Sequence, residues 1–290
     1  MRKFLKKIRY LSEYIVVVIF LKIIGIFGID KAADICGFIA RKIGILFAVN
    51  KIAKRNIKAV FGDAFDVEKT IDQTWDNFGR FIGEFAYVNE MDELELERRT
   101  EIVGRENIEK LQGQPFLIVT GHFANWDIGL KLIQKFYPKF AVIYRKANNS
   151  YVNRLINESR ASDKLRLIPK GLSGGRDLIK AIKARESIAM LVDQKMNNGI
   201  EVPFLGYPAM TANAIAKIAL QYGYPIVPCQ IIRTKGSYFK IIVHPSLTWE
   251  QTGDDKLDSY NIMLNINQII GDWVKQNPSQ WFWFHNRWKK

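Results

Sequence analysis

The sequence predicts an α/β fold with a mostly parallel central sheet flanked by helices, preceded by a helical, membrane-associated N-terminal region. After residue 113, short apolar runs alternate with amphipathic stretches of about ten to fifteen residues, a pattern typical of parallel α/β sheets. Strands covered on both faces have continuous apolar sequences, as these runs do. The start of the chain, both basic and apolar, predicts the membrane-associated region. We therefore expect a membrane anchor at 1–30 and a single α/β domain at 31–290.

The N-terminal segment combines positive charge with an apolar run. Residues 2–9 contain five basic side chains, and the run 14–29 is interrupted only by Lys22. Such a run spans about 24 Å as a helix, which is less than the roughly 30 Å core of a bilayer. We expect an uncleaved anchor that lies in or dips into the cytoplasmic leaflet, with Lys22 reaching the headgroups. A single span and a buried core helix remain alternatives.

The remaining elements follow from hydrophobic periodicity. Helices are expected through 30–94, because apolar residues recur there at steps of three and four. Strands are expected in the runs PFLIVTG, FAVIYR, LRLIPK and SIAMLVD, with helices near 126–136, 149–161, 175–184 and 211–222. The runs IVPCQII and YFKIIVH predict a hairpin across 234–237, followed by a helix near 258–276. Alternation in WFWFH predicts a last buried strand.

Composition restricts the classes of function. Lys and Arg outnumber Asp and Glu by 43 to 29, and a net charge of +14 favours a polyanionic partner. Nucleic acid, an anionic membrane, a phosphorylated lipid and an acidic carrier protein all meet that description. Because no nucleic-acid-binding motif accompanies the basic, aromatic C-terminus, we expect no nucleic-acid partner. Two cysteines and three histidines provide no disulfide framework or zinc cluster, and we expect no metal or cofactor.

The main chemical signal lies directly after the first apolar run, in GHFANWD. His122 follows the predicted strand, and Asp127 comes five positions later. In parallel sheets, sites collect at the carboxyl ends of strands. If a helix begins at Asn125, we expect the carboxylate of Asp127 to fold back on the imidazole and orient it as a general base. A packed, hydrogen-bonded structural histidine would have the same spacing.

Several segments in matching order resemble one protein family. They are GHFANWD with its His-x4-Asp spacing, YRKANNS, Asp193 and Gln194 after a predicted strand, VPFLGYPAMT, and the ending PSQWFWFHNRWK. Over about residues 50–290 the chain resembles the lipid A late acyltransferases, the lauroyl and myristoyl transferases of Gram-negative bacteria. These are similar in turn to the wider His-x4-Asp glycerolipid acyltransferases. Lys146 departs from the family, in which proline commonly follows the Tyr-Arg pair.

The resemblance implies an O-acyltransferase that needs no cofactor. Such enzymes move a fatty acyl chain from acyl carrier protein, or from coenzyme A, to a hydroxyl of a lipid A precursor. His122 would be the general base, supported by Asp127. Arg160 would donate to the oxyanion, and Arg145 would bind a phosphate or carboxylate of the acceptor. Asp193 and Gln194 would position a sugar or shape the pocket.

The implied location is the cytoplasmic face of the bacterial inner membrane. The implied partners are the acyl donor, a phosphorylated glycolipid acceptor and the anionic leaflet. Three alternatives remain open at this point: another lysophospholipid or glycolipid acceptor, a catalytically silent lipid-binding protein of the same fold, and a thioesterase-like hydrolase.

Overall fold

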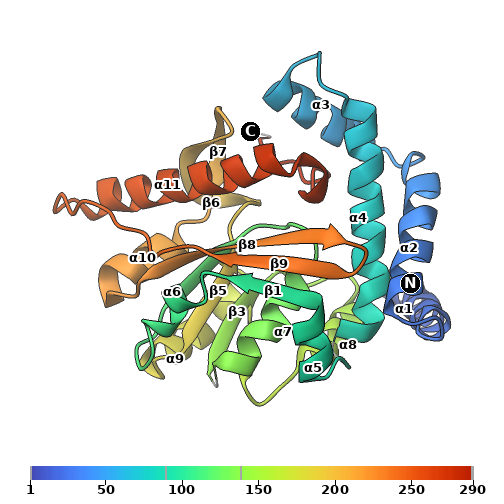
Figure 1. Ribbon diagram of the computed structural model, residues 1–290, viewed down its shortest axis with the longest axis horizontal. Coiled ribbons are helices and arrows are strands. Elements are labelled where there is room, and N and C mark those ends of the chain that lie inside the picture. The colour runs from blue at the N-terminus through green and yellow to red at the C-terminus, as the bar shows by residue number, and fades with distance from the viewer. Residues whose placement is uncertain (1, 89, 138, 289–290) are drawn as a thin grey trace.

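The central element of the structure, a computed structural model that describes residues 2–88, 90–137 and 139–288, is a seven-stranded sheet (Figure 1). Its strand order is β1-β9-β8-β2-β5-β3-β4, and every pairing is parallel except that of β8 with β9. The strands are β1 (Thr100–Val103), β2 (Leu117–Thr120), β3 (Phe140–Tyr144), β4 (Leu165–Pro169), β5 (Ser187–Leu191), β8 (Ile226–Lys235) and β9 (Tyr238–Val243). The predicted fold class, with a mostly parallel sheet flanked by helices, is confirmed.

Helices cover both faces of the sheet, which explains the continuous apolar strands. All four residues of β2 are buried. Ile118 packs with α6 (Glu106–Glu109) and α7 (Trp126–Phe136), whereas Leu117 and Val119 face α10 (Ala214–Tyr222) and α11 (Asp255–Gln276). Alternate residues of one strand therefore belong to two separate cores. The remaining helices of this region are α8 (Ser150–Arg160) and α9 (Gly175–Lys183).

Most predicted elements form close to their expected positions. The helix predicted at 126–136 is α7, and the hairpin across 234–237 joins β8 to β9. The helix expected at 211–222 begins only at Ala214, because the residues before it form β7 (Tyr207–Thr211). This strand pairs with β6 (Lys195–Phe204) in an antiparallel ribbon that we did not predict. Strand β1 at the sheet edge was also not predicted.

The prediction of a final strand in WFWFH is wrong. After a short 3-10 turn (Pro278–Gln280), the chain makes a single bridge between Trp281 and Phe123 and then turns, with the amide of Trp283 donating to the carbonyl of Trp281. Trp281 and Trp283 are both fully buried, so the aromatic residues fill a core instead of alternating across a sheet.

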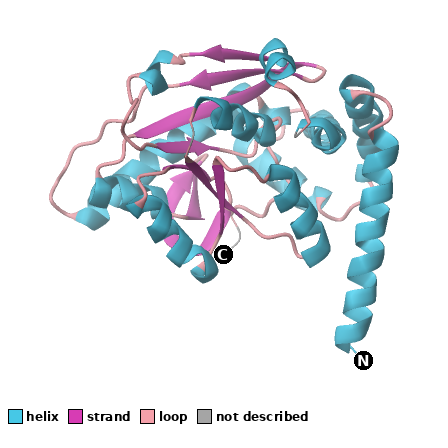
Figure 2. Cartoon of the chain, turned by 90° about the horizontal axis from the view of Figure 1, so that it is seen from below, coloured by secondary structure: helices cyan, strands magenta, loops and turns pink. Residues whose placement is uncertain are grey.

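The N-terminal third is helical, as predicted, and packs along one side of the sheet domain. Its helices are α1 (Arg2–Ile24), α2 (Ile29–Gly44), α3 (Asn50–Phe61), α4 (Val67–Val88) and α5 (Glu93–Arg99). In Figure 2, α1 is the long helix that ends at N beside the main body. It contacts α8, where the Asn149 amide donates to the Tyr10 carbonyl and to Glu13, both at 2.8 Å. The proposed anchor boundary at residue 30 stays a prediction.

Among the described residues, no helix has both the length and the apolar composition needed to cross a bilayer.

Close packing of α2 against α4 depends on glycine. A Cβ atom on Gly79 would lie 2.3 Å from the carbonyl oxygen of Cys36, and one on Gly83 would lie 2.4 Å from that of Ala32. Both obstacles are backbone atoms, so the two helices would have to separate to accept a side chain. The glycines therefore fix how closely α2 approaches α4.

We expect Gly79→Ala to lower the free energy of unfolding by roughly 1–3 kcal/mol, because overpacking outweighs the better helix propensity of alanine. Urea unfolding followed by circular dichroism measures the change. Gly175→Ala is the control, since a Cβ there meets no heavy atom within 4 Å. A Gly79→Ala protein as stable as the wild type would contradict the role of this contact.

Candidate active site

A short loop between β2 and α7 carries His122, and two backbone hydrogen bonds attach this loop to the C-terminal segment. The carbonyl of His122 accepts a hydrogen bond from the amide of Phe282 at 3.1 Å, and the amide of Ala124 donates to the carbonyl of Gln280 at the same distance. Ala124 has φ 45°, a left-handed conformation that residues other than glycine rarely adopt. The C-terminal segment thus holds the histidine loop in a strained, defined shape.

Helix α7 begins where the sequence analysis expected it. The side chain of Asn125 caps the helix by accepting from the amides of Asp127 at 3.0 Å and Ile128 at 3.3 Å. Its own amide group donates to Glu84 Oε2 at 2.8 Å. The cap that starts the helix is therefore attached to α4.

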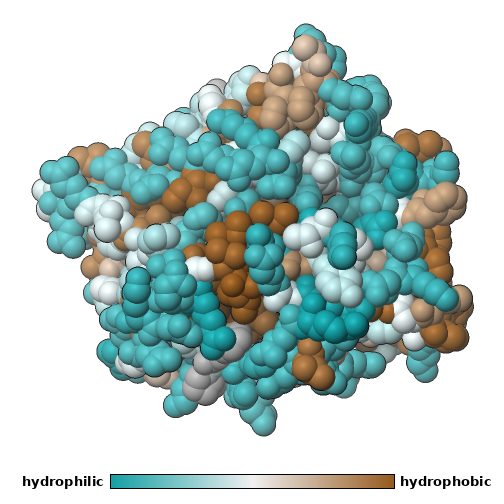
Figure 3. All heavy atoms as spheres, viewed as in Figure 1, coloured by the Kyte–Doolittle hydropathy of each residue, from teal (hydrophilic) through white to brown (hydrophobic). Residues whose placement is uncertain are grey.

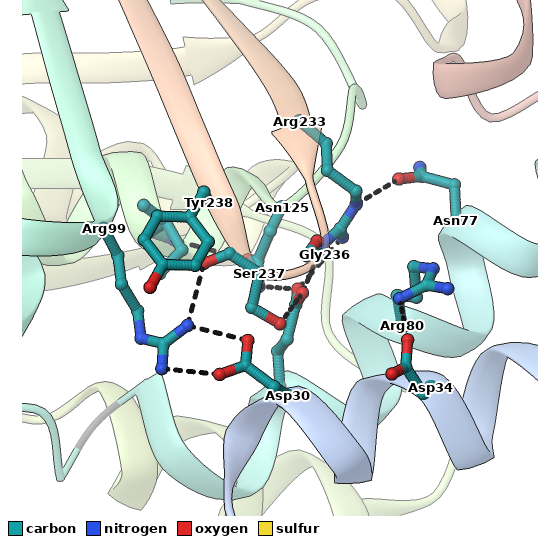
Figure 4. Close-up of polar contacts among 12 residues, drawn as sticks. Asp30, Asp34, Asn77, Arg80, Arg99, Asn125, Arg233, Gly236, Ser237 and Tyr238 are labelled. Atoms are coloured by element: carbon teal, nitrogen blue, oxygen red, sulfur yellow. Dashed lines mark hydrogen bonds and ion pairs between the residues drawn. The ribbon is translucent and has the colours of Figure 1, made fainter.

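A buried ion pair holds this cap in place (Figure 4). Glu84 has no exposed surface, and its carboxylate accepts from the guanidinium of Arg233, from Ser237 Oγ at 2.8 Å and from Asn125. Arg233 also donates to Asn77 Oδ1 at 3.0 Å. Every oxygen of the buried carboxylate is satisfied, as a charge removed from water requires. Helix α4, the β8–β9 hairpin and the His122 loop are joined at this point.

His122 is oriented by Asp193, not by Asp127, so the predicted pairing is corrected. His122 Nδ1 lies 2.7 Å from Asp193 Oδ1, and the backbone amide of His122 donates to Asp193 Oδ2 at 2.7 Å. The indole of Trp281 donates to the same Oδ2 at 2.8 Å. The physical reason is topology, because β2 and β5 are parallel neighbours and their carboxyl ends place Asp193 directly beside His122.

The buried carboxylate of Asp193 is ionised. Burial alone would raise its pKa, but the charge and hydrogen bonds of His122, together with the indole of Trp281, outweigh that effect and lower the pKa to about 2. Because the ionised carboxylate can only accept, Nδ1 of His122 carries a proton in this hydrogen bond. Nε2 then carries the lone pair and faces the side-chain amide nitrogen of Gln194 at 3.3 Å. This tautomer has the free nitrogen that a general base requires.

Asp127 forms a second ion pair, with Arg160 at the end of α8. Its two carboxylate oxygens lie 2.8 and 2.9 Å from the terminal nitrogen Nη2 of Arg160. Asp127 is buried, and the side chain of Arg160 is 15% exposed. The Nε–H of Arg160 is buried and has no hydrogen-bond partner in the described part of the chain. A fixed, unused donor is therefore present near the histidine loop.

One large cavity brings most of the predicted site residues together. Its volume is about 800 Å³, and its walls include His122, Asp127, Arg160, Gln194 and Arg145. Asp193 is not part of the wall, since it lies behind His122, where it is 2% exposed. Most of the other lining side chains are apolar, and they come from α1, α7, α8, α9 and the central strands. A polar cluster in the wall of a large, mostly apolar cavity suits a lipid substrate.

Several residues of the site were not predicted. Asn125 and Trp281 lie in the segments GHFANWD and PSQWFWFHNRWK, but their hydrogen bonds to Glu84 and Asp193 were not predicted, and Glu84 belongs to no motif. Lys170 lines the cavity at the end of β4. The signal that could have found Lys170 is its place after the predicted strand LRLIP, equivalent to that of Arg145 after FAVIY.

The lowered pKa of Asp193 predicts how pH affects stability. An unfolded aspartate titrates near 3.9, so the ionised carboxylate stabilises the folded state above about pH 4, and this contribution is lost as the pH falls toward 2. Asp193→Asn should be less stable by roughly 2 kcal/mol at pH 5–7, and the difference should shrink below pH 4. Urea unfolding across this pH range measures it.

Asp272→Asn, which removes an exposed charge on α11, is the control for the loss of a charge as such. A stability difference between Asp193→Asn and wild type that stays constant from pH 7 to pH 2.5 would contradict an ionised, paired Asp193.

Comparison with known proteins identifies one family. A family model described as bacterial lipid A biosynthesis acyltransferase matches residues 1–290. No curated protein sequence matches the chain. Among solved structures, the chain is similar to the crystal structure of the 1-acyl-sn-glycerophosphate (LPA) acyltransferase PlsC from Thermotoga maritima, with 13% identity and a TM-score of 0.38 over 79% of this chain and 95% of that chain.

The structural likeness is too low to support a further argument, whereas the family match covers the whole chain. The chain belongs to the bacterial lipid A biosynthesis acyltransferase family, and it is an acyltransferase.

Proposed function

We propose that this protein transfers a fatty acyl chain from a thioester of acyl carrier protein, or of coenzyme A, to a hydroxyl of a lipid A precursor. The observation that carries the proposal is the His122–Asp193 pair at the wall of the apolar cavity. Family membership supports the acyl transfer, and the site chemistry below supports the direct mechanism.

The first step uses the free ring nitrogen of His122. Nε2 takes the proton of the acceptor hydroxyl while its oxygen forms a bond to the thioester carbonyl carbon. Asp193 stabilises the imidazolium that results, through the Nδ1 hydrogen bond at 2.7 Å. The carbon–sulfur bond then breaks, and the imidazolium returns its proton to the departing thiolate. The products are an ester and a free thiol, so protons and electrons balance without a cofactor.

The tetrahedral intermediate needs a hydrogen-bond donor for its oxyanion, and Arg160 meets that need. Its side chain lines the cavity, and Asp127 fixes its guanidinium through Nη2. A donor held in place before the reaction stabilises developing charge without reorganisation. In this proposal, Asp127 orients Arg160 rather than the histidine. Asp193, the other carboxylate, supports His122.

The cavity supplies a dry site for the acyl chain. Its wall includes Gly129 of α7, Ile231 of β8, and Val17 and Phe20 of α1. Exclusion of water would suppress hydrolysis of the thioester, which is the competing reaction. Because α1 forms part of the wall, a lipid chain leaving a membrane at this helix would enter the cavity directly.

The N-terminal helices support association with an anionic leaflet. Among the described residues, most of the large apolar side chains that are exposed lie between residues 4 and 47. They include Ile26 at 78% exposure and Leu46 at 80%. In Figure 3, apolar surface appears at the edge where Figure 1 places α1 and α2. Lys and Arg residues accompany this surface, which is the composition of an in-plane membrane contact.

Phosphates of the acceptor and the acidic carrier protein both suit the charge of +14. We therefore propose the cytoplasmic face of the bacterial inner membrane as the working location.

The function is tested with purified protein, labelled acyl carrier protein thioester and candidate acceptors, with mass spectrometry of the lipid products. We expect acylation of the lipid A precursor, and His122→Ala should lower kcat/KM at least about 100-fold because the base is lost. Asn148→Ala, which changes an exposed residue outside the cavity wall, is the control.

Preferential acylation of another lysophospholipid or glycolipid would identify a different acceptor. Release of fatty acid without acylation would indicate a hydrolase, and no reaction on any lipid would favour a silent lipid-binding protein.

Membrane association is tested by co-sedimentation with vesicles that contain phosphatidylglycerol. The double variant Ile26→Ser, Leu46→Ser should bind roughly tenfold or more weakly, because each replacement removes an exposed apolar side chain from the contact. Leu257→Ser on α11 is the control, as Leu257 is exposed but lies far along the chain from the N-terminal helices. Equal binding by both variants would contradict this membrane contact.

A further inference from the structure

Two cations occupy equivalent positions at neighbouring strand ends in the cavity. Strands β3 and β4 are parallel, with Tyr144 opposite Pro169, and Arg145 and Lys170 are the next residues of each. The backbone amide of Lys170 donates to the carbonyl of Tyr144 at 2.7 Å, so the two chain segments stay together beyond the last pair of the sheet. Both residues line the cavity that contains His122.

Lys170 is half-buried and faces no carboxylate at hydrogen-bond distance, as is also the case for the fully buried Arg287, whose guanidinium donates to the carbonyl of Met210 and to Thr211 Oγ1. Arg99, Arg160 and Arg233 each face a carboxylate at hydrogen-bond distance. Within the described residues, the ammonium group of Lys170 makes no hydrogen bond or ion pair, and neither does the guanidinium of Arg145. Burial lowers the pKa of Lys170, and the nearby positive charge of Arg145 lowers it further. A half-buried cation loses part of its hydration, and an anionic ligand would compensate for that loss.

Three glycines in the turn after Lys170 form part of the cavity wall. Gly171 has φ 97°, and a Cβ on Gly174 would lie 1.8 Å from the carbonyl oxygen of Pro169, so only glycine fits at that position. Gly171, Gly174 and Gly175 all line the cavity. This turn fixes the end of β4, and therefore the origin of the Lys170 side chain, relative to the cavity wall.

We propose that Lys170 and Arg145 form a binding subsite for a phosphate group of a substrate. The inference rests on the proposed function, which brings phosphate-bearing molecules to this cavity. A phosphate dianion would neutralise both cations, with the planar guanidinium binding two oxygens and the ammonium binding as a point charge. The phosphate comes either from the acceptor lipid or from the phosphopantetheine of the acyl donor, and these sources can be separated by experiment.

The test compares Lys170→Gln with wild type on matched substrates. One arm uses the phosphorylated acceptor and its dephosphorylated counterpart. The other arm uses acyl carrier protein thioester and the acyl thioester of N-acetylcysteamine, which has no phosphate. We expect Lys170→Gln to raise KM roughly 10- to 100-fold for the partner whose phosphate occupies the subsite, with little change in kcat, because a charge-assisted hydrogen bond is lost. For the counterpart without phosphate, KM should not change.

Two further variants separate binding from structure. Lys170→Arg should restore most of the affinity, since the positive charge returns. Lys146→Gln, which removes the exposed cation next to Arg145 but outside the cavity wall, should leave KM unchanged. An unchanged KM for Lys170→Gln on every substrate would overturn the subsite. An equal loss with phosphorylated and phosphate-free substrates would also overturn it.

Failure of the proposed function remains distinguishable from failure of the subsite. If the wild type acylates no lipid, binding of inorganic phosphate is followed by ³¹P NMR on the intact protein. Line broadening with wild type that disappears with Lys170→Gln and persists with Lys146→Gln would support the subsite without any activity. Equal broadening with all three proteins, or none with wild type, would overturn it.

Discussion

The buried carboxylate of Asp193 is the constraint on which the site depends. It is 2% exposed and accepts hydrogen bonds from the backbone and ring of His122 and from the indole of Trp281. A charge in this position is tolerated only when its hydrogen-bonding capacity is used. The end of β5, the His122 loop and the C-terminal segment must therefore all be in place at once, which ties the general base to the completed fold.

The spacing within GHFANWD selected two residues that both line the cavity, but the pairing it predicted between them is wrong. Asp127 is buried and lies in the first turn of α7, as expected, but its carboxylate binds Arg160. The partner of His122 is 71 positions away in sequence, on a strand whose place beside β2 only the sheet order reveals. Local spacing could place both residues after strand β2, but it could not show which side chain from a neighbouring strand meets the imidazole.

The same distinction explains how much of the fold was predictable. The parallel strands were recognisable because burial on both faces makes them continuously apolar. The β6–β7 ribbon was not, since Asn197, Asn198 and Gly199 interrupt the run and prolines at 203 and 208 argue against a strand. WFWFH alternates like a strand, yet its tryptophans fill the core near Asp193. Glu84 could not be assigned, because its partners lie on elements far apart in sequence.

Electrostatics gives a reason for two separate ion pairs. A histidine that takes a proton inside a cavity containing Arg160, Arg145 and Lys170 must gain its positive charge among other cations. Asp193 offsets this repulsion at the ring itself, and Asp127 neutralises the nearest guanidinium while leaving one of its N–H groups unused. With only one carboxylate, either the imidazolium or the arginine would remain uncompensated in a poorly solvated site. In the proposed mechanism, Asp193 and Asp127 therefore serve separate steps, the proton transfer to His122 and the stabilisation of the oxyanion by Arg160.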